Sequence, residues 1–361
     1  MKIQSIELKH LSIPLKKTFR TALRCVDSAE NTVVLVKTDH GDIGYGEVPP
    51  TEVITGDTNE SIIAAVKLMG KSLLGLDIDH LERIMNVINS SCVNSTSAKA
   101  AVDMAIYDLM AKNCGKPLYK FLGGYRDSVE TDLTISINEP DEMCQDAINA
   151  KEQGFNVLKL KVGIDFEKDI QRVSAIRKAV GNQIKLRLDA NQGWTPKEAV
   201  RVIRSLEDKG MNIELVEQPV KASDFKGMKY VTDNVSTPIM ADESLFSPED
   251  ALRLLQMKAA DLLNIKLMKC GGIYNALKIN AIAESYGVEC MLGSMIESKI
   301  SLTAATHLAA AKKNITRVDL DAAILLADDP VLGGFRKQIP FFYPGDAPGL
   351  GITGVINLRD I

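Results

Sequence analysis

Eight short β-rich runs, roughly 20 to 30 residues apart and separated by amphipathic helical patterns, occupy the chain from about residue 127 onward. The runs are 131–137, 157–162, 184–189, 213–217, 238–242, 262–268, 289–295 and 316–321. This alternation predicts an α/β protein in which a parallel sheet closes into a modified (β/α)8-type, TIM-like barrel. An open doubly wound sheet is the competing arrangement, but the sequence contains no GxGxxG turn after a strand, which is the commonest sign of that fold.

The N-terminal third of the chain has a different rhythm. Strand and helix patterns occur there at 6–15, 32–37, 43–48, 61–74, 81–90 and 97–112. We therefore expect an α+β domain over residues 1–125, a barrel domain over 126–335, and a C-terminal segment, 336–361, that returns to the first domain. Two polar segments, 16–29 and 49–58, are predicted to be loops.

Composition and charge disfavour several classes of protein. The chain has 361 residues, of which 45% are apolar and 25% are charged, which is typical of a globular protein. The net charge of -4 disfavours a nucleic-acid partner. No apolar run approaches the ~20 residues of a membrane helix, so we expect no membrane association. The six cysteines match no zinc spacing and predict reduced thiols in a cytoplasmic protein, for which a homo-oligomer is possible.

Charged residues occur where the interior of a barrel should be apolar. Because side chains alternate along a strand, Lys159 and Lys161 both point inward if the leucine between them faces the helices. Two ammonium groups in an interior are costly unless the site uses them. The alternative is an edge strand with both lysines in water, but a closed barrel has no edge.

Three successive strands end in a carboxylate, namely Asp189, Glu217 and Asp242. Active sites of barrels lie at the C-terminal ends of the strands, so these side chains should converge there. Converging carboxylates repel one another unless a cation joins them, and oxygen ligands favour Mg²⁺, with Mn²⁺ possible. Each acid could instead cap the helix that follows it, although this explanation is weak for three strands in a row.

Strands two and six lie on opposite sides of an eight-stranded barrel. Lys161 ends strand two and Lys266 lies on strand six, so their ammonium groups should face each other across the barrel mouth. Such a pair could act as bases on the two faces of one carbon. Asp319 and Asp321 on strand eight also point inward and could hold a second metal or a cationic substrate group. A structural salt bridge with Arg317 is the alternative for this acidic pair.

These motifs resemble the muconate-lactonizing subgroup of the enolase superfamily. The resemblance rests on Lys159-Leu-Lys161, Asp189-Ala-Asn-Gln, Glu217-Gln-Pro, Ala-Asp242-Glu-Ser and Asn-Ile-Lys266. Gly44-Tyr-Gly-Glu47 and the segment 115–124 extend it over nearly the whole chain. The resemblance implies a proton transfer next to a carboxylate with the help of Mg²⁺.

Within that subgroup the chain is similar to the L-Ala-D/L-Glu epimerases. Those enzymes carry an Asp-x-Asp after strand eight, matched by Asp319-Leu-Asp321, and an arginine in the first capping loop, matched by Arg24. Further substrate-contact positions of the group are matched by Thr134, Ser294, Met295 and Ile296. The resemblance implies that the acidic pair binds the dipeptide ammonium and that Arg24 binds the Glu side chain, although Arg20 could share that role.

We therefore expect an isomerase that moves a proton at the α-carbon of the C-terminal residue of a dipeptide. The metal held by the three carboxylates acts as a Lewis acid on the substrate carboxylate, and Lys159 adds positive charge near the same oxygens. Lys161 and Lys266 then exchange protons on opposite faces of the carbon. By resemblance, residues 1–125 form a capping domain on the catalytic barrel of residues 126–335, and the loops 16–29 and 49–58 cover the substrate. The biological role that the resemblance implies is the metabolism of cell-wall peptides.

Other functions remain possible on the same residues. They are a dipeptide epimerase of another specificity, an o-succinylbenzoate synthase or cycloisomerase, and a non-enzymatic metal-binding protein. The synthases have no evident use for the Asp pair, and a non-enzymatic protein would not need opposed lysines. Mandelate-type enzymes and sugar-acid dehydratases are disfavoured, because strand seven lacks their histidine.

Overall fold

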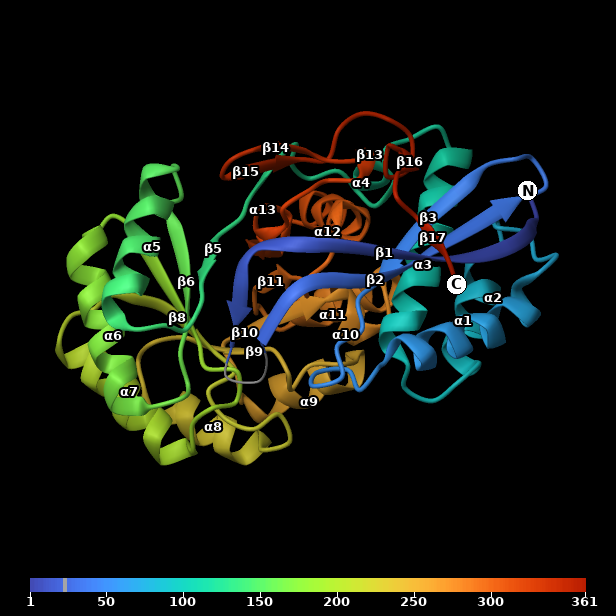
Figure 1. Cartoon of the computed structure of the whole chain (residues 1–361). Helices are drawn as coiled ribbons and strands as arrows, with labels where there is room; N and C mark the ends of the chain where they lie inside the picture. Colours follow the sequence, from blue (N-terminus) through green and yellow to red (C-terminus); the bar gives the residue numbers. More distant parts are fainter. Residues whose placement is uncertain (22–24) are drawn as a thin grey trace.

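The computed structural model describes residues 1–21 and 25–361, and its centre is a sheet of eight parallel strands (Figure 1). The strands follow the order β12-β11-β10-β9-β8-β7-β6-β5. They are β5 (Leu133–Ile135), β6 (Val157–Lys161), β7 (Lys185–Asp189), β8 (Ile213–Glu217), β9 (Ile239–Ala241), β10 (Leu262–Lys266), β11 (Cys290–Gly293) and β12 (Ile315–Asp319). Each strand overlaps one of the eight predicted runs, and the predicted barrel with its N-terminal capping domain is confirmed.

Hydrogen bonds link the first and last strands of this sheet. The backbone N–H of Asp132 donates to the carbonyl of Val318 at 3.3 Å. The N–H of Leu320 donates to the hydroxyl oxygen of Thr131 at 2.9 Å. These bonds hold β12 beside the segment that leads into β5, and so they close the circle.

Helices surround the barrel and connect its strands. They are α5 (Pro140–Glu152), α6 (Phe166–Val180), α7 (Pro196–Asp208), α8 (Phe225–Asn234), α9 (Pro248–Met257), α10 (Leu267–Cys270), α11 (Ile273–Ser285), α12 (Lys299–Ala311) and α13 (Ala322–Leu325). Helix α7 shows how the sequence starts one of them. Thr195 and Glu198 form a reciprocal capping box around Pro196, which suits the first turn. The apolar face of α7 is buried and includes Val202 and Ile203.

The capping domain consists of an antiparallel sheet and its own helices. The sheet has the order β17-β1-β2-β3, and its members are β1 (Ile3–Arg20), β2 (Cys25–Thr38), β3 (Ile43–Val48) and β17 (Arg359–Asp360). The helices are α1 (Asn59–Leu73), α2 (Leu81–Ser90), α3 (Thr96–Asn113) and α4 (Leu118–Phe121). Because Lys9 of β1 pairs with Asp360 of β17, the chain returns to this sheet at its C-terminal end.

Short strands connect the barrel with that C-terminal return. They are β4 (Val129–Glu130), β13 (Val331–Gly333), β14 (Arg336–Gln338), β15 (Phe341–Tyr343) and β16 (Ile352–Val355). They form two small antiparallel sheets, β13-β16 and β14-β15-β4. Among the described residues, no helix has the length and apolar character needed to cross a membrane.

The expectation of a covering loop over 16–29 is wrong in its extent. β1 continues to Arg20 and β2 begins at Cys25, and these two residues pair in the ladder. The ribbon of β1 and β2 runs from the capping helices toward the barrel (Figure 1). Much of this part of the ribbon is solvent-exposed, so it lacks the buried apolar alternation by which strands are recognised.

Gly44 and Gly46 let β3 pack directly against the backbone of α3, instead of forming the hairpin turn that a GxG triplet usually indicates. A Cβ at Gly44 would lie 2.2 Å from the carbonyl oxygen of Ala105. At Gly46 it would lie 1.8 Å from the carbonyl oxygen of Ala101. No side chain fits there without moving the strand away from the helix.

We therefore expect Gly46→Ala to lower the free energy of unfolding by about 3 kcal/mol, because the core must open to admit the methyl group. Gly70→Ala in α1 is the matched control. The nearest atom to its added Cβ is Ile6 Cδ1 at 3.7 Å, so it should raise stability by up to ~1 kcal/mol. Urea denaturation of both variants provides the measurement. A Gly46→Ala protein as stable as the control would contradict this account of the packing.

Candidate active site

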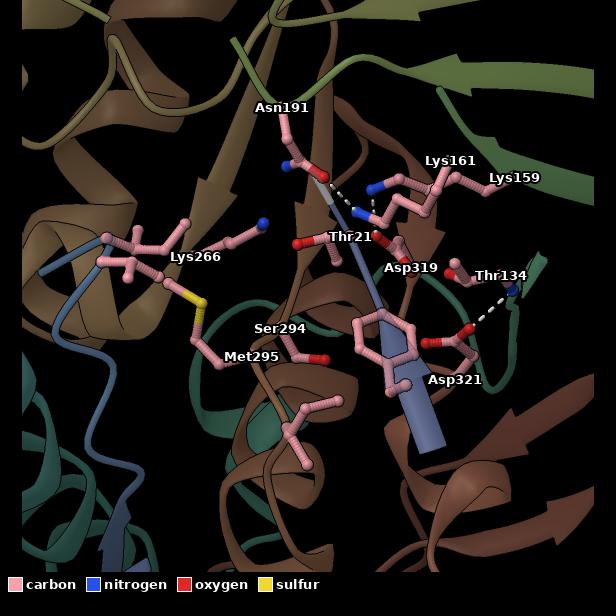
Figure 2. A pocket seen from close by; sticks show the side chains of 14 residues that line it. Thr21, Thr134, Lys159, Lys161, Asn191, Lys266, Ser294, Met295, Asp319 and Asp321 are labelled. Atoms are coloured by element: carbon pink, nitrogen blue, oxygen red, sulfur yellow. Dashed lines mark hydrogen bonds and ion pairs between the residues drawn. The ribbon is translucent and has the colours of Figure 1, made fainter. Parts of the chain in front are cut away.

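A pocket at the C-terminal ends of the barrel strands contains most of the predicted site (Figure 2). Part of its lining comes from the capping domain, namely Phe19, Thr21, Val53 and Ile54. The remainder comes from barrel strands and the loops after them, namely Thr134, Lys159, Lys161, Asn191, Lys266, Ser294, Met295, Ile296, Asp319 and Asp321. The two domains therefore form the pocket together.

Lys161 and Lys266 enter the pocket from opposite sides and point toward each other (Figure 2). Lys161 Nζ lies 2.6 Å from Asp189 Oδ2 and 3.1 Å from Asn191 Oδ1. Lys266 Nζ lies 2.7 Å from Asp242 Oδ2. Burial favours the neutral amine of Lys266, but the negative charges of Asp242, Glu217 and Glu243 together outweigh burial and raise the pKa of this lysine. A substrate carbon between the two amines would have one nitrogen on each face.

Lys159 lies among three carboxylates. Its Nζ is 2.9 Å from Asp189 Oδ2, 2.8 Å from Glu217 Oε2 and 2.8 Å from Asp319 Oδ2. Burial favours loss of its proton, but the surrounding negative charges raise its pKa well above the ordinary value. Lys159 is therefore a positive charge held among these three carboxylates.

The three carboxylates predicted to bind metal are fully buried, and each of them contacts at least one of the pocket lysines. Burial and then the charge of Asp189 raise the pKa of Glu217 to about 8. Burial also acts to raise the pKa values of Asp189 and Asp242, but nearby lysines outweigh it and lower both. Of the three carboxylates, Glu217 is thus the one whose negative charge is least compensated by nearby lysines.

The chemistry of these carboxylates fits a hard divalent cation. All the candidate ligand atoms are oxygens, and Glu217 Oε2 has the ion pair with Lys159 at 2.8 Å but no hydrogen bond of good geometry. Asn264 Nδ2 donates to the other oxygen, Glu217 Oε1, at 2.7 Å and orients the group. Among the residues described, no three acidic, histidine or cysteine side chains already stand at metal-ligand separations. The ammonium group of Lys159 lies between Asp189 and Glu217 instead.

The acidic pair on strand eight also faces the pocket. Asp319 binds Lys159, and Asp321 Oδ2 accepts the backbone N–H of Thr134 at 2.6 Å. Burial, followed by the charge of Asp319, raises the pKa of Asp321 to about 6. The alternative of a salt bridge to Arg317 is not observed, because Arg317 Nη1 lies 2.6 Å from Glu289 Oε2.

Comparison with known proteins decides the family. Residues 142–354 match the model described as enolase C-terminal domain-like. Residues 5–123 match the N-terminal domain of mandelate racemase and muconate lactonizing enzyme. The chain belongs to the enolase superfamily. Its resemblance to that superfamily, predicted from the strand motifs, is confirmed.

Several relatives of this enolase-superfamily protein are similar over their full length. The L-Ala-D/L-Glu epimerase of Clostridium acetobutylicum is 52% identical over 358 residues, which cover 99% of this chain and 100% of the relative. A substrate-liganded structure of the Bacillus subtilis L-Ala-D/L-Glu epimerase has a TM-score of 0.97 at 54% identity, covering 98% of this chain and 99% of its own. A dipeptide epimerase from Enterococcus faecalis, complexed with Mg and L-Leu-L-Tyr, has a TM-score of 0.96 at 50% identity, covering 98% and 100%.

Sequence reasoning missed one buried cation of this enolase-superfamily site. Lys269 is fully buried, and its Nζ lies 2.5 Å from Asp242 Oδ1 and 3.1 Å from the carbonyl of Asn264. It also donates to the backbone carbonyl of Asp242. Asp242 therefore has Lys266 on one carboxylate oxygen and Lys269 on the other. The available signal was a second lysine one helical turn after Lys266.

One predicted substrate contact, Arg24, lies outside the described residues. The nearby Arg20, the other candidate for that contact, is exposed, and its backbone N–H faces Ser136 Oγ at 3.5 Å. All the other predicted substrate and proton-transfer residues line the pocket, and the three predicted metal ligands contact its lysines.

Proposed function

We propose that this chain is a dipeptide epimerase that interconverts L-Ala-L-Glu and L-Ala-D-Glu with the help of Mg²⁺. The observation that supports this function best is the pair of opposed lysines, Lys161 and Lys266, in one pocket with the inward acids Asp319 and Asp321. Opposed amines suit proton transfer on both faces of one carbon. The acids suit the ammonium group of a dipeptide. The names of the relatives support the same reaction.

The proposed roles follow from the contacts. Asp189, Glu217 and Asp242 would hold a divalent cation, which would supply positive charge near the substrate carboxylate. Lys159 holds its own positive charge beside the same carboxylates. Lys161 takes the proton from one face of the α-carbon, and Lys266 delivers a proton to the opposite face. In the reverse reaction the two amines exchange roles.

The lining of the pocket has a polar part and an apolar part, and we assign different groups of the dipeptide to them. We assign the dipeptide ammonium to Asp319 and Asp321. Thr134, Ser294, Met295 and Ile296 complete the proposed substrate contacts. Arg24 remains our candidate for the Glu side-chain carboxylate, on the basis of the sequence.

The apolar part of the lining supports a second candidate function, an epimerase of hydrophobic dipeptides. Its members are Phe19, Val53, Ile54, Met295 and Ile296.

A comparison of the wild-type protein with an Arg24 variant, each on a panel of dipeptides, tests the proposed specificity. We expect Arg24→Met to lower kcat/KM for L-Ala-L-Glu by about 100-fold, because a charge-assisted hydrogen bond is lost. L-Ala-L-Leu should change by less than about threefold, since it has no side-chain carboxylate to lose a partner. Equal losses for both substrates, or a wild-type preference for L-Ala-L-Leu, would support the hydrophobic alternative.

Substrate affinity should weaken in acid. With its pKa raised to about 6, Asp321 is negatively charged above that pH and becomes neutral below it. A neutral acid attracts an ammonium group less, so KM for a dipeptide should rise as the pH falls through about 6. Steady-state kinetics between pH 5 and 8 give the measurement. An Asp321→Asn control should have a high KM without that rise, and an identical profile in both proteins would refute the assignment.

We also propose a domain organisation and a cellular location for the protein. We propose three segments, a capping domain (1–125), a catalytic barrel (126–335) and a C-terminal return (336–361), and the pairing of β17 with β1 supports the last of them. We also propose a cytoplasmic location, which six free cysteines support. A homo-oligomer and a role in the metabolism of cell-wall peptides remain sequence-based predictions.

A further inference from the structure

Besides Phe19, the apolar part of the pocket has two walls that come from different domains. Val53 and Ile54 come from the capping domain, shortly after β3. Met295 and Ile296 come from the barrel loop between β11 and α12. A substrate side chain between these walls is selected by their separation, so whatever fixes one wall relative to the other also affects selectivity.

Glu47 of β3 joins the capping domain to the barrel wall without lining the pocket. It is fully buried and accepts hydrogen bonds from Ser298 N at 2.8 Å, Ser298 Oγ at 2.8 Å and Ser301 N at 3.0 Å. These donors belong to the first turn of α12, whose free N–H groups favour a negative charge. A carboxylate of the capping domain thus caps the barrel helix that begins directly after the wall.

A second buried carboxylate extends this link into the wall itself. Glu297 Oε1 accepts the backbone N–H of Met295 at 2.7 Å, and its other oxygen accepts the hydroxyl of Ser301. Asn31 Nδ2 donates to Glu47 at 2.5 Å and lies 3.5 Å from the carbonyl of Ile296. Ser301 is therefore shared by the two carboxylates, and the wall is held by both.

Glu47 is connected to the other wall through the chain itself, because Val53 and Ile54 follow it by six and seven residues. The close packing of Gly46 against α3 fixes the strand that carries Glu47. After two prolines, the chain turns at Thr51, whose carbonyl accepts the N–H of Ile54 at 3.0 Å and that of Thr55 at 2.9 Å. A short, hydrogen-bonded segment therefore leads from Glu47 to the capping wall.

We propose that Glu47 is a positioning residue that fixes the two apolar walls relative to each other and thereby sets the side-chain selectivity of the enzyme. The inference rests on the proposed dipeptide epimerase function. It assigns no contact with substrate to Glu47, and it predicts an effect on selectivity that exceeds the effect on proton transfer.

Asp103 offers a matched control. It is also a fully buried carboxylate of the capping domain that caps a barrel helix, since it accepts the N–H groups of Ile273 at 2.6 Å and Tyr274 at 3.1 Å. Its helix, α11, starts far from both pocket walls in the sequence. Loss of either carboxylate should weaken domain docking, but only loss of Glu47 should change the separation of the two apolar walls.

The test compares Glu47→Gln with Asp103→Asn in the full-length protein. We expect Glu47→Gln to change the ratio of kcat/KM for L-Ala-L-Glu and L-Ala-L-Leu by about tenfold, the effect of losing one charge-assisted hydrogen bond. Amide hydrogen exchange should accelerate at 294–301 and 51–55. Asp103→Asn should leave the ratio and these two segments unchanged. Ser298→Ala removes one hydrogen-bond donor to Glu47 and keeps the Glu47 carboxylate, so it should shift the ratio in the same direction by a smaller amount. This variant replaces Glu47→Gln if Glu47→Gln does not fold.

An unchanged ratio in Glu47→Gln, or an equal change in Asp103→Asn, would overturn the inference. Exchange that accelerates in only one wall would also overturn it, because the walls would then not be linked through Glu47. Failure of the wild-type enzyme to epimerise any dipeptide is a separate result. It would refute the proposed function, and the exchange data would still decide whether Glu47 links the walls.

Discussion

Replacement of Lys266 by alanine is expected to reduce epimerisation by at least about 10³-fold in both directions, the scale of a lost general acid or base. Exchange of the α-proton with solvent should nevertheless survive for one of the two epimers. Lys161 still faces one side of the carbon and can remove and return a proton there. Without Lys266 the other face has no proton donor, so the configuration is retained.

Lys161→Ala should show the complementary behaviour. It should also lose epimerisation, but the surviving exchange should affect the opposite epimer. Proton NMR of each single variant with L-Ala-L-Glu and with L-Ala-D-Glu in D₂O separates the two activities. Exchange of the same epimer in both variants would mean that the lysines do not act on opposite faces.

Removal of divalent cations is expected to have an effect of similar size. EDTA should lower kcat by at least about 10³-fold, because the substrate carboxylate loses the positive charge that stabilises it as the proton leaves. Mg²⁺ and Mn²⁺ should restore activity, since both accept oxygen ligands. Full activity after exhaustive chelation would refute the proposed metal site.

Variants of the carboxylates distinguish metal binding from a general effect of chelation. Glu217→Gln keeps the shape of the side chain and removes its charge, so calorimetric Mg²⁺ affinity should fall by at least about tenfold. Asp208→Asn removes a charge from the exposed end of α7 and should bind Mg²⁺ as the wild type does. Equal affinities for all three proteins would exclude Glu217 as a ligand.

The barrel was predictable because alternation along each strand is a local property. Leu158 and Leu160 face outward, so Lys159 and Lys161 must face inward, and the same reasoning applies to Asp189 on the next strand. The pairing of Lys161 with Asp189 across neighbouring strands follows from register, which the structure supplies. Sequence alternation alone places charges on a face and does not pair them.

The missed features depend on tertiary packing. Lys269 lies in the short helix α10, where side chains do not alternate between two faces as they do in a strand. Its role is visible only from its contact with Asp242. Glu47 is the penultimate residue of a β-rich run, and its partner, the start of α12, is about 250 residues away in the sequence. The β1–β2 ribbon was too polar to be recognised as strand beyond Leu15.

Proton NMR of L-Ala-L-Glu with the wild-type enzyme and Mg²⁺ in D₂O tests the central claim most directly. We expect loss of the Glu α-proton signal alone, together with the appearance of deuterated L-Ala-D-Glu. The Ala α-proton should persist, because only the carbon next to the free carboxylate lies between the two lysines. No exchange at the Glu α-carbon and no epimer would contradict the proposed substrate, and exchange at Ala would contradict the proposed binding mode.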